Sequence, residues 1–148
     1  MSGEILATRK VLIADDNANI REVLTYLLED EGFELLAATD GNDTLRKVRE
    51  FRPDVLFLDE PTSGLDPMGI KTLRDLIVRL NREFGTTIFM NTHLISEISR
   101  TCTSIGVLNQ GELVFRDTIE KVTERYGSES SLEELYLSVT PVQAKGAA

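Results

Sequence analysis

Short apolar runs alternate with amphipathic stretches along most of this chain. Runs with the length and β-forming content of buried strands occur at residues 10–14, 33–38, 54–58, 86–91 and 104–108. Between them, apolar residues recur at the three- and four-residue spacing of a helix face, as in Ile20, Val23, Leu24, Leu27 and Leu28. Strands that alternate with helices favour a mostly parallel sheet with helices on both faces. We therefore expect a three-layer α/β fold with five strands.

The end of the chain adds elements to this pattern. The turn Asn109-Gln110-Gly111 predicts an antiparallel hairpin that ends in a strand at residues 112–115. Helices are expected near residues 118–126 and 131–138, and the tail at 141–148 is expected to be frayed. The size and composition of the chain predict a single compact domain over residues 1–148.

Composition excludes several classes of partner. The 25 acidic and 16 basic residues give a net charge of −9, which argues against nonspecific binding to nucleic acid or to an anionic membrane. No apolar run approaches the roughly 20 residues that span a bilayer. Cys102 is the one cysteine, so no intrachain disulfide can form, and a cytoplasmic location is expected.

Three carboxylates follow predicted strands. Asp15 and Asp16 come directly after the first strand, and Asp59 follows the third. If these strands are neighbours in a parallel sheet, the three side chains meet at one edge and repel one another. A hard divalent cation such as Mg²⁺ would relieve this repulsion through oxygen ligands. The alternative is that Asp15 and Asp16 cap the following helix and Asp59 ends a strand.

Residues 10–59 contain KVLIADDN, REVLTYLLEDEGF and TDGNDTLRKVREFRPDVLFLD, in that order. This arrangement resembles the receiver domains of two-component response regulators and implies a flavodoxin-like strand order, 2-1-3-4-5. The resemblance implies that Asp59 is the phosphorylated aspartate and that Asp15 and Asp16 hold Mg²⁺, with a further ligand from the carbonyl of Pro61. It also makes Thr92 a contact for the phosphoryl group. The family's lysine near the end of the fifth strand has no counterpart at residues 108–110.

From residue 54 onward the sequence contains VLFLDEPTSGLDP, TTIFMNTHLISEISRTC and SIGVLNQGELVFRDT. These segments resemble the C-terminal part of the ATP-binding domain of ABC transporters. The resemblance implies that Asp59 is the Walker B aspartate, Glu60 the general base, and His93 the switch histidine. It makes residues 63–66 a loop that faces a second domain.

The chemistry of that second family depends on a phosphate-binding loop. No GxxxxGKS or GxxxxGKT sequence occurs in these 148 residues, and neither does the LSGGQ signature. Glu60 and His93 then have no bound phosphates to act on, so we expect neither ATP binding nor ATP hydrolysis.

The two resemblances overlap at residues 54–59 and suggest a chimera, with a receiver-like half at 1–59 and an ATPase-like half at 60–140. Deliberate fragment assembly and natural recombination both remain open as its origin. Three functions are considered. The first is an engineered α/β protein without native catalytic activity that retains a Mg²⁺ pocket. The second is a phosphoacceptor receiver of a phosphorelay. The third is a non-hydrolysing fragment that associates, as in a homodimer, through residues 61–66 or a sheet edge.

Overall fold

The computed structural model describes residues 8–127 and 131–140. By its internal contacts the chain divides into two compact units, residues 1–93 and residues 94–148. The single hybrid domain over residues 1–148 stays a prediction. The expected frayed tail at 141–148 lies outside the described residues. Within the described ranges, none of the helices combines the length and the apolar character needed to cross a membrane.

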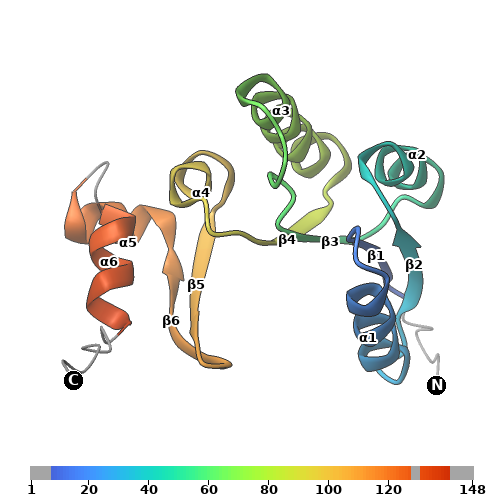
Figure 1. Cartoon of the computed structure of the whole chain (residues 1–148), viewed down its shortest axis with the longest axis horizontal. Coiled ribbons are helices and arrows are strands. Elements are labelled where there is room, and N and C mark those ends of the chain that lie inside the picture. The colour runs from blue at the N-terminus through green and yellow to red at the C-terminus, as the bar shows by residue number, and fades with distance from the viewer. Residues whose placement is uncertain (1–7, 128–130, 141–148) are drawn as a thin grey trace, which may run out of the picture. The chain divides into compact units, whose positions relative to one another are not determined.

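The N-terminal unit is a parallel sheet with three helices. Its elements in chain order are β1 (Lys10–Ala14), α1 (Ala18–Glu29), β2 (Glu34–Ala38), α2 (Gly41–Phe51), β3 (Val55–Asp59), α3 (Pro67–Phe84) and β4 (Thr87–Asn91). The four strands are parallel in the order β2-β1-β3-β4 (Figure 1). This confirms the α/β class and the first four positions of the expected strand order.

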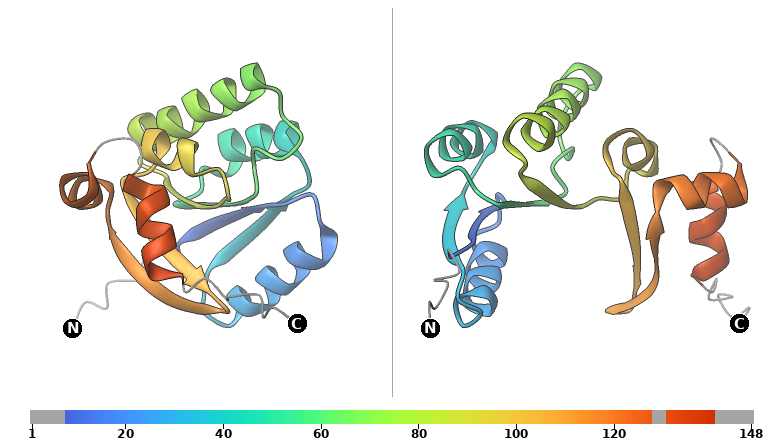
Figure 2. Two further views of the ribbon diagram at one scale, coloured as in Figure 1. Left: turned by 60° about the vertical axis from the view of Figure 1, so that its left-hand side comes forward. Right: turned by 180° about the vertical axis from the view of Figure 1, so that it is seen from behind.

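The core of this unit lies between the sheet and helices α2 and α3. It is made of buried side chains from β1, β2, β3, α2 and α3, namely Leu12, Ala14, Ala38, Val48, Leu56, Leu58, Ile77 and Leu80. Helix α1 lies on the other face of the sheet, so the unit has three layers (Figure 2). Val11 and Ile13 alternate with Leu12 along β1 and are buried on the α1 face.

Side-chain caps fix where the helices begin beside the carboxyl edge of the sheet. The side chain of Asn17 accepts a hydrogen bond from the N–H of Asn19 at 2.9 Å and starts α1. Asp66 accepts from the N–H of Gly69 at 2.7 Å and starts α3. These bonds satisfy N–H groups that have no partner within the helix. The caps therefore fix the residues at which the loops after β1 and β3 end, Asn17 and Asp66.

The C-terminal unit contains α4 (Ile95–Thr101), β5 (Ser104–Asn109), β6 (Glu112–Thr118), α5 (Ile119–Tyr126) and α6 (Ser131–Val139). Its core is built on Val122, Leu132 and Leu135. β5 and β6 form a two-stranded antiparallel sheet of their own. The expected hairpin is confirmed, but the sheet order 2-1-3-4-5 is wrong at its last position, because β5 is not part of the four-stranded sheet.

The turn explains why β5 pairs with β6. Asn109 faces Glu112 in the register, so only Gln110 and Gly111 form the loop. Both have positive φ, 50° and 82°, which is the backbone of the two-residue turns that match the twist of a hairpin. Closing so short a loop costs little chain entropy, and this favours local pairing over a long crossover.

A network of charged groups lies at the start of α2. Asp43 accepts hydrogen bonds from Nζ of Lys47 and Nη2 of Arg46, both at 2.7 Å. The Nζ of Lys47 also donates to the carbonyl of Ala37 in β2 at 2.6 Å. The hydrogen bonds from Lys47 and Arg46 lower the pKa of Asp43 from 3.8 to about 2. The network thus joins α2 to the edge strand β2.

We expect Asp43→Asn to unfold at a lower urea concentration than the parent at neutral pH. A lowered pKa stabilises the fold above the unfolded value of 3.8, and this stabilisation disappears as the pH falls toward about 2. The difference between the two proteins should therefore shrink on acidification, as measured by circular dichroism. Asp75→Asn, an exposed change on α3, serves as the control and should have little effect at either pH. A difference of equal size in acid would contradict an ionic origin.

Candidate functional site

The carboxyl edge of the four-stranded sheet brings together residues that are far apart in the sequence. Asp15 directly follows β1, and Asp59 is the last residue of β3. β1 and β3 are neighbours, with Ala14 opposite Leu58, so the two aspartates leave the sheet side by side. Asp16 follows Asp15 and is exposed. The edge therefore gathers the three carboxylates singled out in the sequence.

Asp15 is the buried member of this group. One carboxylate oxygen, Oδ1, accepts a hydrogen bond from the N–H of Asn17 at 2.7 Å. The other, Oδ2, is enclosed and has no hydrogen-bond partner. Burial raises the pKa of the Asp15 carboxyl, the N–H of Asn17 opposes this, and the charges of Asp59 and Asp16 raise it further. The guanidinium of Arg21 donates to the backbone carbonyl of Asp15 at 2.8 Å, so the unpartnered group of this residue is Oδ2 alone.

Asp59 has a partner that sequence reasoning missed. Asn91 ends β4 opposite Asp59, and its Nδ2 donates to Oδ1 of Asp59 at 2.6 Å. The side-chain amide orients one carboxylate oxygen without neutralising its charge. The sequence did contain a signal for Asn91. The residue ends the predicted strand at 86–91, which the expected order 2-1-3-4-5 places beside the third strand.

Glu60 and His93 meet at the same edge. The Nδ1 of His93 lies 2.8 Å from Oε2 of Glu60, in an ion pair that is charged only when the histidine is protonated. The contact does not meet the geometry of a hydrogen bond. The N–H of Glu60 donates to the carbonyl of Asn91 at 2.9 Å. Glu60 also has a φ of 41°, a conformation that costs energy in a residue with a β-carbon.

The loop after β3 contains another buried polar group. Pro61 is half-buried, and Thr62 is buried with a hydroxyl that has no hydrogen-bond partner. The N–H of Leu65 donates to the carbonyl of Thr62 at 3.2 Å and closes a turn. Asp66 then caps α3. Thr92 follows β4 directly and is half-buried. Sequence reasoning did not single out Thr62, since nothing in the sequence marks its hydroxyl as buried.

The carboxylates are close without forming a ready metal site. In residues 8–127 and 131–140, no three His, Cys, Asp or Glu side chains are grouped so that they could hold a metal ion. The donors at the edge are nevertheless carboxylate and carbonyl oxygens, which hard divalent cations prefer. The enclosed, unpartnered Oδ2 of Asp15 fits such a cation, since a positive charge would offset its burial.

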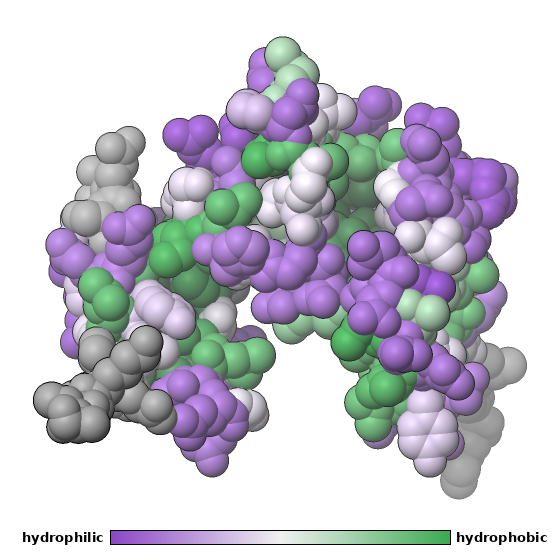
Figure 3. All heavy atoms as spheres, in the orientation of Figure 1, coloured by the Kyte–Doolittle hydropathy of each residue, from purple (hydrophilic) through white to green (hydrophobic). Residues whose placement is uncertain are grey.

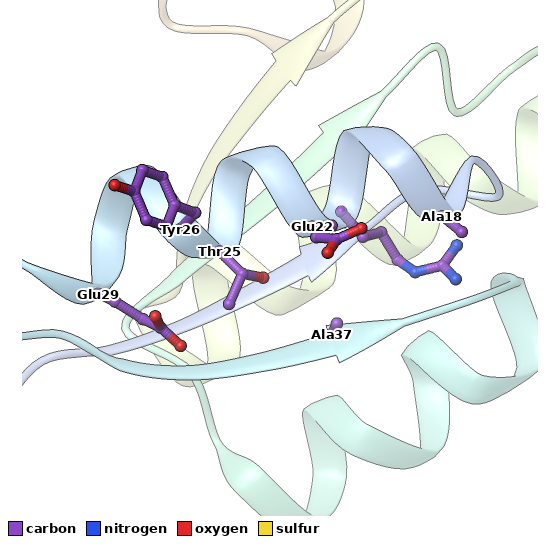
Figure 4. Close-up of a pocket in the computed structure, with 7 residues that line it drawn as sticks. Ala18, Glu22, Thr25, Tyr26, Glu29 and Ala37 are labelled. Atoms are coloured by element: carbon purple, nitrogen blue, oxygen red, sulfur yellow. The ribbon is translucent and has the colours of Figure 1, made fainter.

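Two hollows of this unit lie elsewhere. One, of about 420 Å³, lies between α1 and β2 (Figure 4) and is lined by Ala18, Arg21, Glu22, Thr25, Tyr26, Glu29 and Ala37. The other, of about 240 Å³, is lined by Val48, Arg52, Pro53, Asp54, Glu83, Phe84, Gly85 and Thr86. Neither includes one of the three carboxylates.

Two groups of known proteins are similar to this chain. An ABC transporter ATP-binding protein of Bacillus subtilis, YcbN, is 40% identical over 94 residues, which are 64% of this chain and 29% of that protein. The structure of cbiO1 from Clostridium perfringens, part of the ABC transporter complex cbiONQ, is 29% identical with a TM-score of 0.52, and the match covers 74% of this chain and 47% of that one. The chemotaxis response regulator CheY4 of Vibrio cholerae is 31% identical with a TM-score of 0.46, over 56% of this chain and 67% of that one.

The chain thus spans less than a third of the length of YcbN. Its similarity to ABC transporter ATP-binding proteins stands beside a similarity to a second family. The response regulator receiver domain family matches residues 11–108, which is more than half of the chain and continues well past Asp59. The order of the four parallel strands, with one aspartate directly after β1 and one at the end of β3, agrees with this match. The chain belongs to the response regulator receiver domain family.

Proposed function

We propose that this protein is an engineered chimera of a receiver domain and an ABC ATPase fragment, which binds a divalent cation at its acidic edge and has no native catalytic activity. Both similarities include a buried strand that ends in an aspartate, here β3 (Val55–Asp59). A junction on this strand preserves its pairing with β1 and β4. Deliberate assembly from fragments would make use of such a shared segment.

The observation that carries the proposal is the unpartnered Oδ2 of Asp15. A buried carboxylate oxygen without a hydrogen bond is costly, and the charges of Asp59 and Asp16 add to that cost. Mg²⁺ would be held by Asp15, Asp16 and Asp59, with the carbonyl of Pro61 as a further ligand. The bound ion would supply positive charge for the carboxylates and for an anionic group beside them.

The sequence supports the absence of ATP hydrolysis. It lacks the glycine-rich loop and lysine that hold the β- and γ-phosphates. Without that loop, neither Glu60 nor His93 has a phosphate beside which to act.

Mg²⁺ should raise the melting temperature of the parent protein and leave that of Asp59→Asn unchanged at equal ionic strength. A ligand at ten times its Kd stabilises the folded state by about 1.4 kcal/mol, which corresponds to several degrees for a unit of this size. Circular dichroism is the suitable measurement, because the chain has no tryptophan. Asp75→Asn, which removes a carboxylate from the exposed side of α3, is the matched control and should respond as the parent does. If Mg²⁺ stabilised Asp59→Asn as much as the parent, the ion would have to bind at a site that does not include Asp59.

ATP hydrolysis by the parent should equal that by Glu60→Gln, both at the level of a buffer blank, when phosphate release is measured with Mg²⁺ and ATP. The glutamine keeps the size of the side chain and removes its basicity. A rate that depends on Glu60 would contradict the proposal, because contaminating ATPases would be common to both preparations.

A second function is favoured by the surroundings of Asp59. The carboxylate is half-buried at the carboxyl edge, oriented by Asn91 at 2.6 Å, with Thr92 next in the chain. In a phosphoacceptor, one oxygen of Asp59 would form a bond to phosphorus while the bond from phosphorus to the leaving group of the donor breaks. Asn91, which is hydrogen-bonded to Asp59, and Thr92, which is next in the chain, would contact the transferred group.

Acetyl phosphate with Mg²⁺ is the probe for this second function. We expect the parent to gain the mass of one phosphoryl group and to lose it at alkaline pH, since acyl phosphates hydrolyse readily. Asp59→Asn should gain none, whereas Asp75→Asn should be labelled as the parent is. If the parent is not labelled but is still stabilised by Mg²⁺, the result would support the cation site and contradict the phosphoacceptor function.

A further inference from the structure

Two carboxylates of the acidic edge are each held through one oxygen. Oδ1 of Asp59 accepts a hydrogen bond from Nδ2 of Asn91 at 2.6 Å, and Oδ1 of Asp15 accepts from the N–H of Asn17 at 2.7 Å. Oδ2 of Asp15 is enclosed and has no hydrogen-bond partner. Both side chains are therefore oriented through Oδ1, and Oδ2 is the oxygen that each of them can offer to an ion.

The group that orients Asp59 is fixed by the sheet. Asn91 lies opposite Asp59 in the β3–β4 register, and its carbonyl accepts from the N–H of Glu60 at 2.9 Å. The backbone of Asn91 is thus bonded to the residue that follows Asp59, so its side-chain amide has little freedom to move away. The amide is also neutral, so it orients the carboxylate and leaves the negative charge for a cation.

Mg²⁺ and Ca²⁺ differ in what they require of such carboxylates. Mg²⁺ needs near-octahedral geometry with oxygens at about 2.0–2.1 Å and keeps several of its waters. Hydrophilic surface is present where Figure 1 labels β3 and β4 (Figure 3), which suits an ion that keeps water. Ca²⁺ accepts about six to eight oxygens at about 2.3–2.6 Å in flexible geometry, often with both oxygens of one carboxylate. Carboxylates that are held in one direction therefore favour Mg²⁺.

We infer that Asn91 is a positioning residue that makes the acidic edge select Mg²⁺ over Ca²⁺. The inference rests on the cation site proposed above and adds the residue that determines which cation the site prefers. With the amide in place, Asp59 offers one oxygen in one direction. Without it, the carboxylate turns and binds through both oxygens, which Ca²⁺ accepts and the strict geometry of Mg²⁺ does not favour. Groups that orient a metal ligand typically change metal affinity by about 10–100-fold.

Isothermal titration calorimetry of the full chain with MgCl₂ and, separately, with CaCl₂ at equal ionic strength tests the inference. The parent should bind Mg²⁺ with the lower Kd. Asn91→Ala should raise the Kd for Mg²⁺ at least about tenfold and change the Kd for Ca²⁺ by less than about threefold, because only Mg²⁺ depends on the fixed direction of Asp59. The ratio of the two Kd values is therefore the quantity to compare.

Asn42→Ala is the matched control. Asn42 is an exposed asparagine like Asn91, but it lies in the first turn of α2. The variant should keep both Kd values of the parent. A merely structural role of Asn91 would lower the melting temperature of the metal-free protein, measured by circular dichroism, and would weaken the binding of both ions by the same factor. The ratio of the two Kd values would then stay that of the parent.

Asn91→Asp is a second variant, which keeps the size of the side chain and replaces the amide donor with a carboxylate. It should lower the Kd for Ca²⁺ below that of the parent, because additional negative ligands raise the affinity for Ca²⁺. The inference is overturned by a parent that binds Ca²⁺ as tightly as Mg²⁺, by an unchanged ratio in Asn91→Ala, or by a Ca²⁺ affinity that does not rise in Asn91→Asp. In these outcomes the parent still binds Mg²⁺, so the cation site stands. A parent that binds neither ion contradicts the cation site itself, and the inference with it.

Discussion

The position of β3 between β1 and β4 determines the rest of the N-terminal unit. Its start is held from both sides, since Oδ2 of Asp54 accepts from the N–H of Lys10 at 2.8 Å and the carbonyl of Asp54 accepts from Thr87 at 2.8 Å. Its end is held by the side chain of Asn91. A shift of one residue in this pairing would turn Leu56 and Leu58 out of the core. The same register places Asp59 beside Asp15.

Much of this arrangement could be predicted from the sequence, because apolar periodicity reflects burial. Every expected helix and strand is present, with ends that differ by a few residues. The caps at Asn17 and Asp66 have local hydrogen bonds, and Asn17 was recognisable from its residue type and position. The place of β5 was not predictable in this way. Alternation alone cannot distinguish a strand that joins a distant sheet from one that pairs across a two-residue turn.

The candidate site was predictable in its residues and less so in its contacts. Carboxylates that follow neighbouring parallel strands must approach one another, so Asp15 and Asp59 could be grouped from sequence alone. The contact from Asn91 depends on the exact β3–β4 register, and the burial of the Thr62 hydroxyl depends on how a loop closes. Such details arise from tertiary packing, which a single sequence does not encode in a local pattern.

The parallel order of the four strands also affects how the chain becomes folded during synthesis. β4 reaches its place beside β3 only after the whole of α3, from Pro67 to Phe84, has been made. The hairpin of β5 and β6 needs to close only the loop at Gln110 and Gly111. Contacts between distant residues form more slowly than local ones. On the ribosome, the edge of β3 therefore stays open until residue 91 has emerged from the exit tunnel.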